Sequence, residues 1–372
     1  MAIVAPAVPG QTLDSVDTPA LVVELSAFER NLKTLADAVS GRGIRVRAHA
    51  KTHKSPEIAK RQVAAGAVGM CCQKVSEAEI LVDGGIEDVL VSNEVVGIAK
   101  LDRLAALAKR ARIGVCVDDA ANVRDVDAAA GRAGSRFDAY VEIDVGARRC
   151  GVAPGEPALA LGRQVAACRN LRFAGLQAYH GSAQHLRGMD ERRTAIEKAA
   201  AAASQTRKLL ESAGIACPVV TGAGSGTFMF ETTSGVYDEI QPGSYIFMDA
   251  DYAKNEWSAP QPRFEHALFI LTTVMSRPTA DRAVVDAGLK ASSVDSGMPV
   301  VWNRPGLRYT RPSDEHGVIE IAPGAAAPVL GEKLLLVPGH CDPTVNLHDW
   351  YVAIRDGKVE SLWPVAARGA LF

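Results

Sequence analysis

Histidines give the first indication of chemistry, because they gather in a few polar segments of the chain. Seven of the eight histidines fall into four clusters, each in a polar or glycine-containing setting. The clusters are His49 with His53, His180 with His185, His316, and His340 with His348. Histidine acts near neutral pH as a general acid or base and as a metal ligand. A single histidine of this kind is commonly only hydrogen-bonded or exposed, so the prediction of a reactive site depends on their clustering.

Lys51 lies in the segment Arg45-Val-Arg-Ala-His-Ala-Lys-Thr-His-Lys54, at the end of an expected strand and with cations on both sides. Burial and nearby positive charge both lower the pKa of an amine. The neutral amine is the form in which a lysine makes a Schiff base with a carbonyl cofactor. A solvated basic strand end is the alternative interpretation, and this segment alone leaves both open.

A glycine-rich segment, Thr221-Gly-Ala-Gly-Ser-Gly-Thr227, can offer backbone amides and hydroxyl groups to a phosphate. Gly243 and Ser244 follow the next expected strand and can contribute to the same site. The segment lacks the opening position of a Rossmann fingerprint and the Gly-Lys-Ser/Thr ending of a Walker loop. Glycine-rich turns are common, so an ordinary turn is the alternative.

The segment Leu336–Asp349 places His340 and Asp342 two residues apart, a spacing that puts both on one side of an extended chain. A nitrogen and a carboxylate completed by water and substrate suit Mg²⁺ or Mn²⁺ better than Zn²⁺, although Cys341 between them keeps Zn²⁺ possible. A structural turn is the competing interpretation of this segment.

Eight short apolar runs rich in β-branched residues alternate with amphipathic or alanine-rich stretches, which is typical of parallel βαβ units. The expected strands are Ile44–His49, Ala67–Cys72, Asp88–Asn93, Ile113–Asp118, Ala139–Asp144, Phe173–Tyr179, Cys217–Gly222 and Glu239–Gly243. This pattern predicts an α/β protein with a (β/α)8 TIM-type barrel, and a doubly wound open sheet is the alternative. In a barrel, the polar residues that follow each strand meet at the C-terminal face, where barrel enzymes have their active sites.

The sequence pattern changes after about residue 255, where runs of alternating apolar residues are separated by Pro, Gly and Asn. Such runs predict a second, mostly β domain. A strand at Thr18–Leu25 precedes the first helix and stands outside the barrel count. We therefore expect a barrel over residues 26–254 and a β domain made of residues 1–25 and 255–372.

The charge balance favours small-molecule chemistry. The 372 residues carry 41 Lys and Arg against 43 Asp and Glu, without a basic block, so we expect no nucleic-acid or membrane partner. Seven cysteines without Cys-x-x-Cys spacing argue against disulfides and a zinc finger. The first ten residues have no basic region and contain two prolines, so we expect a cytoplasmic protein.

Several segments occur in an order that resembles a known family. They are Asp17-Thr-Pro-Ala-Leu, Arg47-Ala-His-Ala-Lys-Thr-His-Lys-Ser, Cys71-Cys-Gln-Lys-Val-Ser-Glu-Ala-Glu, Gly146-Ala-Arg-Arg-Cys-Gly-Val, Gln177-Ala-Tyr-His-Gly and Pro338-Gly-His-Cys-Asp-Pro-Thr. Together they resemble the D-threonine aldolase and D-serine dehydratase family, which belongs to the alanine-racemase-like pyridoxal-phosphate enzymes. The resemblance runs from about residue 14 to the C-terminus and implies a barrel followed by a β domain.

The resemblance implies a role for each matching residue. Lys51 is similar to the lysine that holds pyridoxal phosphate, Arg149 to the cation facing its phenolic oxygen, and Tyr179 to a residue near its pyridine nitrogen. His185 is similar to a residue proposed as acid or base, and His340 with Asp342 to the metal pair of the aldolase branch. The candidates for the cofactor phosphate are Ser225, Gly226, Thr227, Gly243 and Ser244.

The implied activity is metal-activated cleavage of D-threonine and related β-hydroxy-D-amino acids to glycine and an aldehyde. The dehydratase branch has His-x-Cys at the metal site, whereas this chain has His340-Cys-Asp342, which favours the aldolase branch. Three alternatives remain: an aldolase for 3-hydroxy-D-aspartate, a dehydratase for D-serine or 3-hydroxy-D-aspartate, and a non-catalytic pyridoxal-phosphate-binding protein. The resemblance also implies a homodimer.

Overall fold

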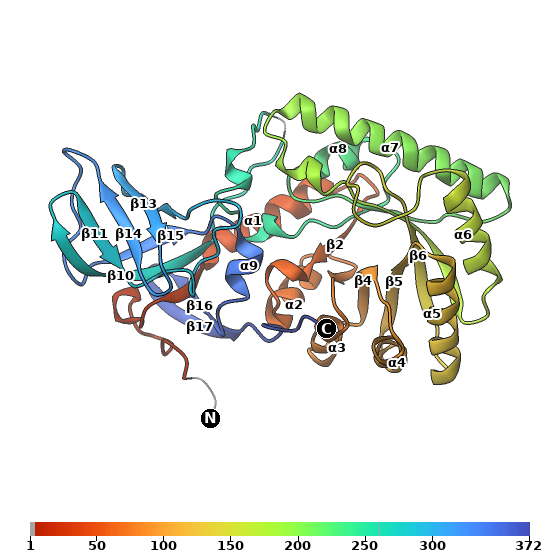
Figure 1. Ribbon diagram of the computed structural model, residues 1–372, viewed down its shortest axis with the longest axis horizontal. Helices are drawn as coiled ribbons and strands as arrows, with labels where there is room; N and C mark the ends of the chain where they lie inside the picture. The colour runs from red at the N-terminus through yellow and green to blue at the C-terminus, as the bar shows by residue number, and fades with distance from the viewer. Residues whose placement is uncertain (1–3, 260) are drawn as a thin grey trace.

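The protein consists of a helix-covered barrel and a β-rich domain that lie side by side (Figure 1). The computed structural model describes residues 4–259 and 261–372. Residues 1–3 and 260, which the sequence assigns to the β domain, lie outside this description. Within the described residues, none of the helices has the length and apolar character that a membrane span requires.

Eight parallel strands close the barrel, because the last strand pairs with the first. The strands are β2 (Arg45–His49), β3 (Gly69–Cys72), β4 (Asp88–Glu94), β5 (Arg112–Val117), β6 (Phe137–Glu142), β7 (Leu171–Ala178), β8 (Val220–Gly222) and β9 (Glu239–Ile240). Each lies within or overlaps one of the eight expected runs. The barrel prediction is confirmed, and the open-sheet alternative is wrong.

Helices cover the outside of the barrel and bury their apolar faces against the strands. They are α1 (Leu25–Val39), α2 (Pro56–Ala64), α3 (Val75–Asp83), α4 (Ile98–Leu107), α5 (Ala120–Ala133), α6 (Glu156–Ala167), α7 (Met189–Ser212) and α8 (Phe228–Thr233). Capping groups define several helix ends. Asp119 accepts hydrogen bonds from two amides at the start of α5, and Gly134 ends that helix with a left-handed φ of 64°.

An ion network lies in the interior of the barrel. Arg47 is two residues before His49 on β2, so both side chains point to the same face of the strand. Arg47 donates from Nε to Glu239 Oε1 at 2.9 Å and from Nη1 to Asp88 Oδ1 at 2.6 Å. Glu239 also accepts from Thr221 Oγ1 at 3.0 Å. The network joins β2, β4, β8 and β9 below the cavity described next.

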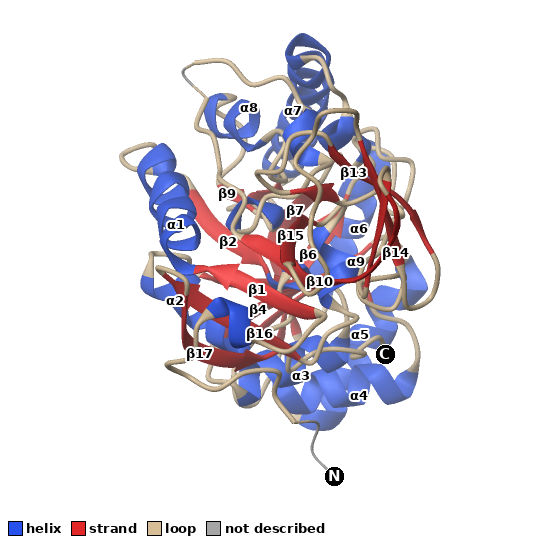
Figure 2. Ribbon diagram, turned by 90° about the vertical axis from the view of Figure 1, so that its left-hand side faces the viewer, coloured by secondary structure: helices blue, strands red, loops and turns tan. Residues whose placement is uncertain are grey.

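The β domain is a nine-stranded sheet that combines the start and the end of the chain. Its strands are β1 (Ala20–Glu24), β10 (Leu268–Thr279), β11 (Arg282–Val285), β12 (Val300–Val301), β13 (Leu307–Pro312), β14 (Gly317–Ile321), β15 (Lys333–Val337), β16 (Trp350–Arg355) and β17 (Lys358–Pro364). β1 pairs antiparallel with β10 and parallel with β16 (Figure 2). The expected strand at Thr18–Leu25 therefore lies outside the barrel, while the domain limits at residues 25 and 254 remain predictions.

Candidate active site

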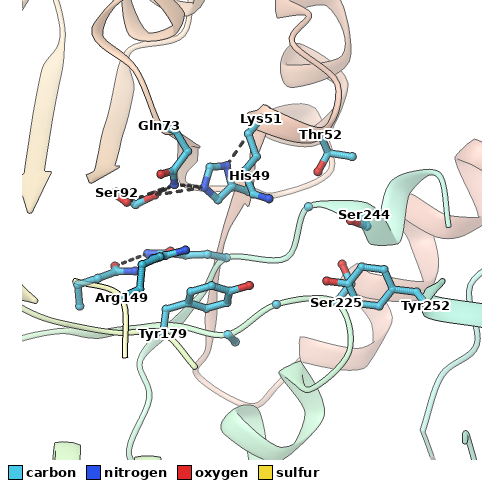
Figure 3. A pocket seen from close by; sticks show the side chains of 15 residues that line it. His49, Lys51, Thr52, Gln73, Ser92, Arg149, Tyr179, Ser225, Ser244 and Tyr252 are labelled. Atoms are coloured by element: carbon cyan, nitrogen blue, oxygen red, sulfur yellow. Dashed lines mark hydrogen bonds between the residues drawn. The ribbon is translucent and has the colours of Figure 1, made fainter. Parts of the chain in front are cut away.

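A cavity of about 190 Å³ opens at the C-terminal ends of the barrel strands (Figure 3). Its walls come from segments that follow six of the eight strands and from the 3-10 helix at Tyr252–Lys254. The lining residues are His49, Lys51, Thr52, Gln73, Ser92, Arg149, Gln177, Tyr179, Ala223, Gly224, Ser225, Gln241, Gly243, Ser244 and Tyr252. Five of the eleven site residues predicted from the sequence, namely Lys51, Arg149, Tyr179, Ser225 and Ser244, line the cavity with side chains, and Gly243 adds backbone.

Lys51 points into the cavity from a 3-10 helix, Ala50–Thr52, that directly follows β2. Its Nζ donates to Asp342 Oδ2 at 2.6 Å. Burial acts to lower the pKa of Lys51, but the Asp342 carboxylate and the nearby Tyr179 outweigh it and the pKa is raised. The expectation that cationic neighbours make this amine neutral is therefore wrong, because the carboxylate partner dominates.

Asp342 reaches Lys51, at the edge of the cavity, from α9 (Cys341–Val345), the helix that follows β15. A hydrogen bond from Tyr351 Oη to His53 O, at 2.7 Å, ties the β domain to the Lys51 segment. Burial opposes ionisation of Asp342, but Lys51 and His340 hold its pKa well below the usual range. Asp342 Oδ1 is buried and has no hydrogen-bond partner among the described residues, so it is available to a cation.

His340 directly precedes α9, and its Nδ1 lies 2.7 Å from Asp295 Oδ2. The carboxylate accepts a hydrogen bond from Nδ1–H, so the neutral ring presents Nε2 as a lone-pair donor. A carboxylate behind the ring is the usual support of a metal-bound histidine. His340 and Asp342 therefore offer one nitrogen and one oxygen ligand, which fits the divalent metal expected from the sequence.

Arg149 and Tyr179 form a second side of the cavity, with the Arg149 guanidinium 5.6 Å from the centre of the Tyr179 ring. Arg149 Nη2 lies 3.9 Å from Glu142 Oε1. Burial, together with repulsion from Glu94, raises the pKa of Glu142 to about 8. The raised pKa favours the neutral form of Glu142, which leaves the charge of Arg149 free to face an anionic group in the cavity.

The loops after β8 and β9 lie against each other and form an anion cradle. The hydroxyl oxygen of Ser225 accepts a hydrogen bond from the amide of Tyr245 at 2.8 Å, which joins the two loops. The amides of Gly224, Ser225, Gly243 and Ser244 donate to no acceptor within residues 4–259 and 261–372. A Cβ at Gly243 would lie 2.5 Å from Thr52 Oγ1, so only glycine fits there. The cradle suits the phosphate of a cofactor.

Gly226 and Thr227 do not line this cradle. The amide of Gly226 donates to Gln184 Oε1 at 3.0 Å. Thr227 Oγ1 accepts from Gln184 Nε2 at 2.7 Å and donates to Glu231 Oε1 at 2.8 Å. Both residues were expected from their place in the glycine-rich segment. The structure shows them fixing the loop from behind, where they contact Gln184 and α8.

Glu231 gives a prediction about stability. Burial raises its pKa to about 7, so the folded state holds a proton that the unfolded chain releases near pH 4.5. The stabilising effect of the neutral acid is complete below pH 4.5 and is lost as the pH rises through 7. Glu231→Gln is therefore expected to be more stable than the parent by about 2–3 kcal/mol at pH 8, with little difference at pH 4.5.

Thermal unfolding of both proteins across this pH range measures the effect. The exposed Glu211→Gln, at the end of α7, removes a similar charge without burial and serves as the control. An equal gain in both variants at pH 8 would contradict the assignment to buried Glu231.

His185 ends a 3-10 helix, Ser182–His185, and lies beside the cavity without lining it. Its ring centre is 5.4 Å from that of Tyr252, which does line the cavity. Its Nδ1 lies 2.7 Å from Asp251 Oδ2. His185 is 46% exposed, so its ring is open to solvent beside Tyr252.

His49 belongs to one of the histidine clusters noted in the sequence, but no site role was predicted for it or for Gln73 and Ser92, which form the polar floor of the cavity with it. His49 Nε2 lies 2.9 Å from Gln73 Nε2 and 3.2 Å from Ser92 Oγ. Burial and the charge of Lys51 hold the pKa of His49 well below its ordinary value. The position of Gln73 directly after an expected strand was the available signal, whereas Ser92 lies within β4 and gave none.

Comparison with known proteins identifies the class. The family model "Alanine racemase, N-terminal domain" matches residues 23–251, and a serine dehydratase domain model matches residues 267–354. The chain therefore belongs to the D-threonine aldolase and D-serine dehydratase family of alanine-racemase-like enzymes, whose cofactor is pyridoxal phosphate. The Lys51 amine and the anion cradle line the same cavity and fit this cofactor.

Three relatives place the chain within the family. It is 51% identical to a D-threonine aldolase of Arthrobacter sp over 99% of this chain and 97% of that one. It is 49% identical to a 3-hydroxy-D-aspartate aldolase of Paracoccus denitrificans over 98% and 95% of the two chains. The crystal structure of D-threonine aldolase from Filomicrobium marinum superposes with a TM-score of 0.97 at 55% identity and covers 99% of this chain and 100% of that one. The chain is accordingly a carbon–carbon lyase of the aldolase type.

Proposed function

We propose that the protein is a metal-activated, pyridoxal-phosphate-dependent aldolase that cleaves D-threonine and related β-hydroxy-D-amino acids to glycine and an aldehyde. The observation that carries the proposal is the 2.6 Å contact between Lys51 Nζ and Asp342 Oδ2. It brings the lysine that would hold the cofactor next to the residue that would hold the metal. A substrate whose amino nitrogen takes the place of Lys51 would therefore have its β-hydroxyl beside the metal ligands.

Pyridoxal phosphate would be held by Lys51, by Arg149 and by the cradle of Ser225, Gly243 and Ser244. When bound, it supplies an electron sink for the pair released as the Cα–Cβ bond breaks. We assign the phosphate to the unpaired amides of the cradle, with Gly226 and Thr227 supporting it through Gln184. Tyr179 keeps its proton, because burial raises its pKa, and lies on the wall next to Arg149.

The metal would be held by His340 and Asp342, and Mn²⁺ or Mg²⁺ fits better than Zn²⁺. Burial raises the pKa of Cys341 well above its ordinary value, so this thiol stays protonated in the core and is a poor ligand. The remaining nitrogen and oxygen donors suit the harder cations. The metal would supply a Lewis acid that lowers the pKa of the substrate hydroxyl.

His185 is the residue that we assign to remove the β-hydroxyl proton. Its Nδ1 is engaged by Asp251, which leaves Nε2 to accept a proton. The cleavage then requires that the hydroxyl proton leaves as the Cα–Cβ bond breaks, with the carbonyl of the aldehyde forming at the same carbon. The glycine product gains a proton at its α-carbon.

The charges near His185 bear on the choice between the two aldolase substrates. Arg187 donates to the Asp251 carboxylate, and Lys254 Nζ lies 3.9 Å from the same group. One carboxylate balances only one of these two cations, so the group keeps a net positive charge that can attract the second carboxylate of 3-hydroxy-D-aspartate. This substrate is the second candidate because of the 49% identical relative that is named for it. A homodimer and a cytoplasmic location stay predictions from the sequence.

Release of glycine from D-threonine tests the proposal directly. We expect the purified protein, loaded with pyridoxal phosphate, to release glycine with Mn²⁺ present and to lose at least about 90% of this activity on chelation, because Lewis-acid activation contributes several kcal/mol. Re-addition of Mn²⁺ should restore it. Glycine from 3-hydroxy-D-aspartate alone would move the substrate to the second candidate, and ammonia with a keto acid would replace the aldolase by a dehydratase.

A further inference from the structure

Asp251 lies between two segments that flank the mouth of the cavity. One segment is the 3-10 helix that ends at His185, and the other is the 3-10 helix Tyr252–Lys254, which Asp251 directly precedes. The Asp251 side chain is only 7% exposed, and its carboxylate contacts both the His185 ring and the Arg187 guanidinium. Its Oδ2 lies 2.7 Å from His185 Nδ1, and its Oδ1 accepts from Arg187 Nη2.

We propose that Asp251 is a positioning residue that fixes the tautomer and the orientation of His185, so that Nε2 faces the substrate as a bare acceptor. This inference rests on the proposed function only in giving His185 the role of base. The contact between the two side chains, and the proton that it places on Nδ1, can be measured without any activity.

The tautomer follows from the chemistry of the contact. An ionised carboxylate only accepts hydrogen bonds, so the Nδ1 that faces it carries the proton and a neutral ring has Nε2 unprotonated. Within the described residues, the His185 side chain forms its hydrogen bond through Nδ1, to Asp251. Once Nε2 has taken a proton, the same carboxylate stabilises the imidazolium, as the aspartate does in hydrolytic triads.

A scaffold of hydrogen bonds holds the Asp251 carboxylate in place. Arg187 Nη1 donates to Asp251 O at 2.7 Å and to Asn255 Oδ1 at 2.8 Å. Asn255 Nδ2 donates in turn to Gln184 O at 2.9 Å, next to His185. Although burial opposes ionisation, Arg187 and His185 lower the pKa of Asp251, so it is a carboxylate at neutral pH.

Arg192, on α7, donates hydrogen bonds to the backbone just after His185 and just after the 3-10 helix Tyr252–Lys254. It is fully buried, and Nη1 donates to Leu186 O at 2.6 Å and to Arg187 O at 2.8 Å, while Nη2 donates to Glu256 O. Among the described residues this buried guanidinium has no carboxylate partner, and it holds the backbone carbonyls of the two segments that flank Asp251. Such a scaffold is expected where a base must keep a fixed position.

The central variant is Asp251→Asn in the holoenzyme. The asparagine amide can donate to Nδ1 and so turn the ring to the tautomer with a proton on Nε2, as in a hydrolytic triad in which an asparagine replaces the aspartate. We expect kcat for D-threonine to fall by about 10²-fold or more, with KM and the visible spectrum of the bound cofactor unchanged. Asp251→Glu should recover part of the loss, and the exposed Asp190→Asn on α7 should have no effect.

Two further measurements separate positioning from a structural role. In a His185→Gln background, Asp251→Asn should cause no further loss of kcat, because the residue it positions is gone. Histidine ¹⁵N spectra, with the His185 signals assigned from the His185→Gln variant, should show an Nδ1–H tautomer in the parent and a changed one in Asp251→Asn. Equal losses in both backgrounds, or a parent His185 with its proton on Nε2, would overturn the inference.

The proposed function and this inference fail in different ways. An active His185→Gln variant would remove His185 from the mechanism, yet the spectra would still report whether Asp251 fixes the ring. An active Asp251→Asn variant beside an inactive His185→Gln variant would keep the base and reject its positioning by Asp251.

Discussion

Lys51→Ala is expected to abolish cleavage of D-threonine, with a loss of kcat on the order of 10⁴-fold or more, as for other residues that form covalent intermediates. Lys51 is the cavity amine that can form a Schiff base with the carbonyl group of the cofactor. It contacts Asp342 and lies near Tyr179. The visible absorption of the bound cofactor should change as well, since its covalent attachment is lost. Initial rates of glycine release and the spectrum of the dialysed protein measure the two effects.

Two controls define what the Lys51 result means. Lys51→Arg keeps a cation next to Asp342 but cannot form the covalent link, so it should be as inactive as Lys51→Ala. Lys100→Ala removes an exposed lysine from α4 and should leave the rate unchanged. A fully active Lys51→Ala enzyme would end the proposed mechanism, because no other residue was assigned this attachment.

Arg47→Met is expected to lower the free energy of unfolding by about 3–5 kcal/mol, since it leaves the buried Glu239 carboxylate with only the half-exposed Arg45, 3.6 Å away, as a cationic partner. The Arg47 side chain is 4% exposed and Glu239 is fully buried. Burial acts against the charge of Arg47, but Glu239 and Asp88 raise its pKa, so the guanidinium stays ionised. Denaturant unfolding of the parent and the variant measures the difference.

The double variant Arg47→Met with Glu239→Gln tests the reason for this loss. It removes both the cation and its fully buried partner, so it should be more stable than Arg47→Met alone. Arg308→Met breaks an ion pair with Glu320 whose side chains are 75% and 53% exposed, and should cost less than about 1 kcal/mol. Equal losses from Arg47→Met and Arg308→Met would show that burial is not the cause.

The alternation of elements predicted the fold well, because strands in a barrel repeat the same local pattern. The sequence also predicted that the residues following the strands share one site, since a parallel barrel brings the C-terminal ends of all its strands to one face. The least accurate boundaries were those of β8 and β9, which are three and two residues long where six and five were expected. Short strands that end in glycine-rich loops have little periodicity to mark their limits.

The pKa shifts of the site residues could not be predicted, because they depend on contacts between residues far apart in the sequence. The cations near Lys51 are paired elsewhere, Arg47 with Glu239 and Lys54 with Glu77, whereas Asp342 lies 291 positions away. Local charge therefore predicted the wrong direction for the pKa of Lys51. Asp251 and Asp295 were missed for the same reason, because each supports a histidine that is 66 or 45 positions distant.

The pairing of β1 has a consequence for how the protein forms during synthesis. β1 is made before the barrel, yet it pairs with β10 and β16, which are made after the barrel. Barrel strands pair mostly with their neighbours in sequence, whereas β1 must wait for most of the chain, and such distant contacts form slowly. The domain that supplies His340 and Asp342 is thus completed last, so a nascent chain has its cofactor cradle before it has the groups that activate the substrate.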